Sequence, residues 1–207
     1  MFKYLVTIGC LVAFLTLAVG HQAFAQSGGS GNVRTSIMKV HVFGSSAVIN
    51  QAGASLSKNN EAVFANISTS GLPVGEVVTL WWVFFNNPSQ CVTPGCSPPD
   101  LNNPSVNGSL QYGGGAIVGA GGRADFSGYF GLGDNTGFYL LPQFPNMPNP
   151  APGLINTKEA AIHLVIRKHG PASTDPATLA QQLTTFPGGC SVVPNPCANI
   201  QAALFVP

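Results

Sequence analysis

Five cysteines and four histidines are the residues of this chain best suited to covalent or metal chemistry. Cys10 lies in an apolar N-terminal run, whereas the other four cysteines form two close pairs with proline between the partners. This spacing predicts two short-range disulfides, Cys91–Cys96 and Cys190–Cys197, each stabilising the fold by about 2 kcal/mol in the chain-entropy model. A zinc site made of all four cysteines is the alternative, but the interval between Cys190 and Cys197 exceeds the usual ligand spacing.

Three histidines outside the N-terminal segment are the candidate metal ligands: His41, His163 and His169. On a continuous strand, His163 and His169 would lie roughly 20 Å apart, too far to share one ion. A copper- or zinc-binding or redox protein that uses these histidines is therefore an alternative hypothesis, and our main prediction includes no cofactor.

The sequence lacks the familiar patterns of catalysis. It contains no Gly-x-Ser-x-Gly motif, and nothing in the spacing of its seven acidic residues selects a pair of carboxylates. The glycine-rich stretches 113–115 and 119–122 lack the lysine of a phosphate loop and are predicted to be turns. We therefore expect a non-catalytic protein.

Aromatic and amide side chains offer a candidate binding surface. Trp81 and Trp82 are adjacent and would point to opposite faces of a strand. One or both belong to the core, and the favoured interpretation buries both. The alternative is a platform for neutral carbohydrate, for which the candidate ligand-binding residues are Trp81, Trp82, Asn102, Asn103, Asn107 and Tyr112. The disulfide-closed loop over residues 86–109 would carry the asparagines.

Short apolar runs separated by glycine and proline predict the elements that position these residues. Strands are expected over 37–43, 62–68, 77–85, 123–130, 160–168 and 200–206, and the run 77–85 is apolar on both faces, as in a strand covered on each side. Asp175 and Pro176 predict the start of one short helix near 175–184. This pattern indicates an all-β fold, an antiparallel β-sandwich of Greek-key or jelly-roll type, with a β-barrel as the alternative.

The N-terminus has the anatomy of a secretory signal peptide. Lys3 precedes an apolar run over residues 5–19, and Ala23-Phe24-Ala25 is a small-x-small cleavage site. Residues 1–25 are therefore predicted to be removed, residues 26–34 to form a flexible leader, and residues 35–207 to form a single β domain. After cleavage no membrane span is expected, because the apolar run is shorter than a spanning helix needs.

Charge is sparse in this chain. Charged residues are 7% of the sequence, against about 25% in ordinary domains. Removing Lys3 with the signal peptide changes the balance of 8 basic and 7 acidic residues to 7 and 7. A neutral surface gives no electrostatic attraction for nucleic acid and favours self-association.

The segment Ala161-Ile162-His163-Leu164-Val165-Ile166-Arg167-Lys168-His169-Gly170-Pro171-Ala172, the Trp81-Trp82 strand and the two cysteine pairs resemble those of small secreted bacterial proteins of uncharacterised function. The histidine-containing pieces around His163 and His169 also faintly resemble chordin-type CHRD domains, which implies a β-sandwich. Together these observations predict an exported protein, secreted, at the cell surface or in the periplasm. Its expected role is structural or binding, with neutral glycan or a second copy of the chain as candidate partners.

Overall fold

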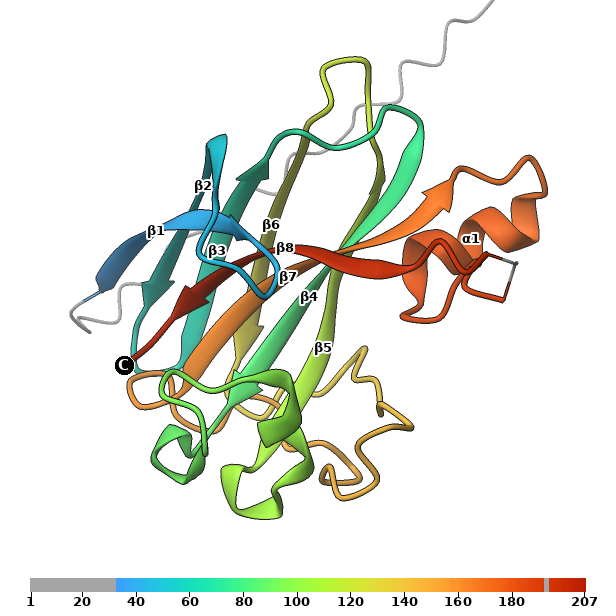
Figure 1. Cartoon of the computed structure of the whole chain (residues 1–207). Coiled ribbons are helices and arrows are strands. Elements are labelled where there is room, and N and C mark those ends of the chain that lie inside the picture. The colour runs from blue at the N-terminus through green and yellow to red at the C-terminus, as the bar shows by residue number, and fades with distance from the viewer. Residues whose placement is uncertain (1–32, 192–193) are drawn as a thin grey trace, which may run out of the picture. The chain divides into compact units, whose positions relative to one another are not determined.

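A computed structural model describes residues 33–191 and 194–207 of the chain. The predicted signal peptide (1–25) and all of the predicted leader except its last two residues lie outside the described residues. The described secondary-structure elements are β1 (Arg34–Val42), β2 (Val48–Lys58), β3 (Ala62–Thr69), β4 (Glu76–Phe85), η1 (Pro88–Gln90), η2 (Pro98–Asn102), η3 (Pro104–Val106), β5 (Gly108–Ile117), β6 (Ala124–Gly131), β7 (Ala161–Pro171), α1 (Pro176–Thr184) and β8 (Ala198–Phe205) (Figure 1).

The eight strands form one antiparallel sheet in the order β5-β4-β7-β8-β1-β2-β3-β6. The sheet curls so that its edge strands, β5 and β6, approach each other without pairing (Figure 1). The predicted all-β, antiparallel class with a single short helix in the described part is confirmed. The arrangement is barrel-like, and most strands bury one face as they would in a sandwich, whereas β1 buries only Val40.

The concave face of the sheet encloses the main core, here called the inner core. It is built from alternating residues of nearly every strand, including Leu56, Ile67, Phe84, Ile162 and Phe205. The Trp82 indole lies where β5 and β6 approach each other. A Cβ added to Gly113 or Gly128 would collide with its ring, so these glycines allow the strands to approach.

The prediction that residues 113–115 form a turn is wrong, because these glycines lie within β5. Gly113 is packed against Trp82, and an added Cβ at Gly115 would overlap the backbone carbonyl of Leu183 at the end of α1. Glycine is therefore used here for close approach between elements rather than for chain reversal. Strand β2, which is rich in Ala, Gly and Ser, was also not predicted.

A second apolar cluster, here called the outer cluster, covers the convex face of β4, β7 and β8. It contains Trp81, Val83, Phe85, Val165 and Ala202 from the strands, and side chains from the loops over 86–107 and 132–160 cover it. Helix α1 packs on β4 and β5. Because β4 is covered on both faces, its continuous apolar run is explained, and both faces of the run 77–85 are buried as predicted.

Candidate functional site

An apolar pocket of about 210 Å³ lies on the outer cluster, and we call it the outer pocket. Trp81, Val83 and Phe85 of β4 form part of its wall, and β7 and β8 contribute His163, Val165, Ala202 and Leu204. Leu110 of β5 and Asn199 of β8 also line the pocket, and the connecting segments supply the remaining lining residues: Phe43, Gly44, Cys96, Ser97, Pro98, Leu101, Leu141 and Phe186. Of these lining residues only His163 is titratable, so the pocket is suited to holding an apolar molecule rather than to acid–base chemistry.

His163 fastens the first disulfide loop to the wall of this pocket. Its Nε2 lies 2.9 Å from the carbonyl oxygen of Gly95, which can only accept, so Nε2 carries the proton. The imidazole packs against the Phe85 ring at a centroid distance of 4.8 Å. Burial lowers the pKa of His163 to about 4, and the hydrogen bond to Gly95 opposes this shift in part. His163 is therefore neutral at pH 7.

Asp100 stabilises the same loop by accepting hydrogen bonds. Its carboxylate accepts hydrogen bonds from the backbone N–H groups of Val92 and Ser97, both at 2.8 Å, and from the Ser97 hydroxyl at 2.9 Å. Burial by itself would raise the pKa of Asp100, but these hydrogen bonds outweigh burial, so the pKa lies below its ordinary value. The Cys91–Cys96 disulfide is therefore flanked by an anion.

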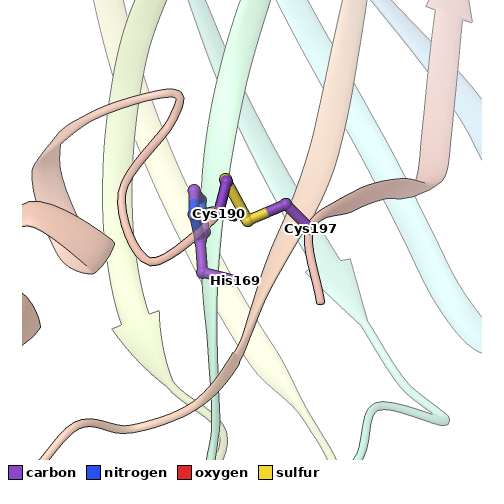
Figure 2. A group of neighbouring side chains, drawn as sticks. All are labelled: His169, Cys190 and Cys197. Atoms are coloured by element: carbon purple, nitrogen blue, oxygen red, sulfur yellow. Dashed lines mark hydrogen bonds between the residues drawn. A yellow bond between two sulfur atoms is a disulfide. The ribbon is translucent and has the colours of Figure 1, made fainter. Parts of the chain in front are cut away.

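The second disulfide, Cys190–Cys197, lies beside His169 of β7 (Figure 2). Both disulfides have the predicted pairing, which is confirmed, and the four-cysteine zinc alternative is excluded in this state. Nδ1 of His169 lies 2.7 Å from the carbonyl oxygen of Gly188 and 3.8 Å from Sγ of Cys197. Burial is the main cause that lowers the pKa of His169; the nearby Arg167 lowers it further, and the hydrogen bond to Gly188 raises it.

A chain of hydrogen bonds holds His169 in one orientation. The indole Nε1 of Trp81 donates to Thr79 Oγ1 at 2.7 Å, and Thr79 Oγ1 lies 2.8 Å from Nε2 of His169. Since Nδ1 donates a hydrogen bond to the Gly188 carbonyl, Nε2 is unprotonated and accepts a hydrogen bond from the Thr79 hydroxyl. The Trp81 indole is thus satisfied inside the protein, although it also lines the outer pocket.

The positively charged group beside the second disulfide is the guanidinium of Arg167, which belongs to β7. Its Nε donates to the carbonyl of Phe186 at 2.9 Å, and its two terminal nitrogens lie 3.1 Å from Asn199 Oδ1 and 3.7 Å from Cys190 Sγ. The guanidinium also lies 4.0 Å above the centre of the Phe186 ring. All of these partners are uncharged.

Trp81 also lines an open groove of about 470 Å³, which we call the aromatic groove. Tyr112, Phe138 and Tyr139 line one part of it, and Gln181, Thr184 and Thr185 line the part that belongs to the end of α1 and the following loop. Trp81, Gly137, Pro187 and Gly188 complete the lining. The groove combines aromatic faces with amide and hydroxyl groups.

The candidate carbohydrate residues do not gather into one surface. Trp81 and Trp82 are 1% and 0% exposed and face the outer cluster and the inner core respectively. Tyr112 contacts Trp81 edge-to-face, with ring centroids 5.6 Å apart. Asn102, Asn103 and Asn107 lie in the loop after β4 and take part in hydrogen bonds within the protein.

The three candidate histidine ligands also lie apart. His41 is at the end of β1, where Nδ1 lies 3.1 Å from the carbonyl oxygen of Ser46, whereas His163 and His169 serve different disulfide loops. Within residues 33–191 and 194–207, the one group of three metal-ligating side chains close enough to share an ion is His169, Cys190 and Cys197.

Sequence reasoning did not single out the loop residues that complete the pocket, above all Leu141 and Phe186. Both stand in Pro-rich stretches without periodicity, so the sequence carries no signal that they pack on β4. The alternation in 160–168 did place His163 and Arg167 on the face opposite the inner core, which is where they lie.

Comparisons of the chain with family models, with curated proteins and with solved structures found no match. Within the described residues, no helix has the length and apolar character needed to cross a membrane. The two disulfides fit an extracellular or periplasmic location.

Proposed function

We propose that this chain is an exported, non-catalytic binding protein that takes a small apolar molecule into the outer pocket. The observation that carries the proposal is a pocket of about 210 Å³ whose walls are almost entirely aliphatic and aromatic. Ligand sites of this kind are typically concave, apolar and largely pre-formed, with few polar groups. The volume suits a molecule with one or two rings or a short acyl chain.

The surroundings of the pocket support this role. A disulfide, the Asp100 carboxylate and the His163 hydrogen bond restrain the loop that forms one wall, so little conformational entropy is lost when a ligand enters. Export is supported by the signal-peptide pattern of residues 1–25 and by the two disulfides.

The proposal is tested by titration with a fluorescent naphthylamine, a small apolar probe. We expect saturable binding of one probe per chain, with energy transfer from Trp81 in the pocket wall. Leu204→Trp, which places an indole at the pocket, should weaken binding about tenfold or more. Val48→Trp is the matched control, because Val48 is similarly exposed on β2 and does not line the pocket. Binding that does not saturate, or that is equal in Leu204→Trp, would refute the proposal.

A neutral carbohydrate in the aromatic groove is the second candidate function. The specific observation that favours it is the pairing of Tyr112, Phe138 and Tyr139 with the polar side chains of Gln181, Thr184 and Thr185. Isothermal titration with neutral gluco- and chito-oligosaccharides tests it. Phe138→Ala should abolish the heat of binding, whereas Phe64→Ala, on the exposed face of β3, should leave it unchanged.

A further inference from the structure

His169 and the Cys190–Cys197 disulfide bring one nitrogen and two sulfur atoms together. The three ligand atoms lie within 4.8 Å of one another (Figure 2). The imidazole is buried, whereas both cysteine residues are half-buried. In the oxidised state the sulfurs bind each other, and a metal site therefore requires the dithiol.

The imidazole is positioned by residues that would also suit a metal-bound histidine. In proteins, a histidine that ligates a metal through one nitrogen commonly donates its other N–H to a hydrogen-bond acceptor. Here Nε2 already faces Thr79 Oγ1 at 2.8 Å. If Nδ1 bound a metal instead of the Gly188 carbonyl, the imidazole proton would be carried by Nε2. Thr79 Oγ1 would then accept two hydrogen bonds, one from Nε2–H of His169 and one from the indole N–H of Trp81.

The positive charge of Arg167 favours a monovalent metal ion over a divalent one at this site. This half-buried guanidinium lies 3.7 Å from Cys190 Sγ and contacts uncharged partners only. Two thiolates with one monovalent ion carry a net charge of −1, which the +1 of Arg167 balances. Two thiolates with Zn²⁺ are neutral and would leave the arginine uncompensated beside a divalent ion. Thiolate and imidazole ligands also suit Cu(I), which accepts low coordination numbers.

We propose that reduction of the Cys190–Cys197 disulfide creates a three-coordinate Cu(I) site from Cys190, Cys197 and His169. A dithiol supplies two electrons and two protons: its own sulfurs form a disulfide, the Cys190–Cys197 bond breaks, and two thiols result. Binding of one Cu(I) then releases the two thiol protons to solvent. This site differs from the histidine set His41, His163 and His169, of which it uses His169 alone, and it does not depend on the outer pocket.

The Cys91–Cys96 disulfide is the built-in control. The Asp100 carboxylate accepts hydrogen bonds from the backbone N–H groups of Val92 and Ser97 beside this disulfide, and His163 bonds the Gly95 carbonyl oxygen within its loop. An anion beside two thiolates disfavours their formation, whereas the group beside the second disulfide is a cation, the Arg167 guanidinium of β7, 3.7 Å from Cys190 Sγ. The proposal therefore assigns copper binding to one of two disulfides of similar size.

The test uses the protein reduced with dithiothreitol, freed of reductant without oxygen, and titrated with Cu(I) against the chelator bicinchoninate. We expect one Cu(I) per chain in the native sequence and in Cys91→Ser/Cys96→Ser, and none in Cys190→Ser/Cys197→Ser. His169→Gln should weaken Cu(I) binding about tenfold or more. Copper retained by Cys190→Ser/Cys197→Ser, or replaced by equimolar Zn²⁺, would overturn the proposal.

X-ray absorption on the loaded native protein gives a second readout that needs no variant. Two sulfur scatterers and one nitrogen scatterer are expected around copper. A shell of nitrogen and oxygen alone would exclude the proposed ligands, even if the His169→Gln variant fails to fold.

Discussion

The two disulfide loops are attached to the same strand, β7, by buried histidines, yet they are anchored by opposite charges. His163 donates to the Gly95 carbonyl of the first loop, and His169 donates to the Gly188 carbonyl of the second. The first loop is then completed by the Asp100 carboxylate, and the second by the Arg167 guanidinium.

The orientation of the peptide groups explains this difference. The first loop turns backbone N–H groups of Val92 and Ser97 inward, so it needs an acceptor, and a buried carboxylate provides two oxygens. The second loop turns the carbonyl oxygen of Phe186 inward, so it needs a donor. A disulfide closes each loop. The position of the loop on the sheet is determined by side chains that accept from its inward N–H groups or donate to its inward carbonyl groups.

The largest loss of stability should come from substituting a glycine, and it should differ between the two loops. A Cβ added to Gly188 would overlap the carbonyl group of Gln181 in α1, whereas at Gly95 the nearest atom would be Val206 Cγ1 at 3.6 Å. Gly188→Ala should therefore lower the free energy of unfolding by about 4 kcal/mol or more. Gly95→Ala should cost about 1 kcal/mol, because its φ of 81° is left-handed. Urea unfolding measures both, and equal losses would contradict the comparison.

The next effect is a loss of stability in acid at the first loop. The pKa of His163 is about 4 in the folded protein and near 6.5 in the unfolded chain, so the unfolded chain binds the proton first as the pH falls. Stability that is complete above pH 6.5 should decline down to about pH 4, by about 3 kcal/mol in total.

His163→Gln isolates this contribution from that of other groups. The variant should show a shallower dependence of the unfolding free energy on pH between 6.5 and 4 than the native protein does. His169, whose pKa is also lowered, acts in the same direction in both proteins and serves as the internal reference. Parallel pH profiles for variant and native protein would show that His163 is protonated without cost.

Neutralising Asp100 should have a somewhat smaller effect. Asp100→Asn replaces one accepting oxygen with a donor that faces backbone N–H groups, which should cost about 2–3 kcal/mol. Arg167→Lys keeps the charge but loses the fork that reaches Phe186 and Asn199, so we expect a smaller loss. Thermal unfolding at pH 7 compares the two variants. A greater loss in Arg167→Lys would reverse the ranking of the two anchors.

The smallest difference should come from the disulfides themselves. The cysteines are five and seven positions apart, so removing either pair by serine substitution should cost about 2 kcal/mol. Urea unfolding of Cys91→Ser/Cys96→Ser and Cys190→Ser/Cys197→Ser should give nearly equal values. A gap of several kcal/mol would mean that one disulfide, rather than its side-chain anchors, holds its loop.

The sequence alone determined the features that depend on local pattern. Alternating residues in 160–168 put Ile162, Leu164 and Ile166 on the inner core, and the short spacing of the cysteines favoured the pairing of each with its neighbour, which is the pairing observed. The helix start at Asp175 and Pro176 was equally local, since the Asp175 side chain caps the Thr178 N–H.

The tertiary structure decided whatever depended on contacts between distant segments. β5 was not predicted because its glycines have no local explanation. Gly113 packs against the Trp82 ring and Gly115 against the Leu183 carbonyl, and both partners are distant in the sequence. The same holds for the outer pocket, whose wall combines β4, β7 and β8 with Leu141 and Phe186. It also holds for the ligand set of His169, Cys190 and Cys197, which forms only because β7 carries His169 past the loop that precedes β8. Packing over such separations leaves no periodic signal in the chain, so only the folded molecule brings these residues together.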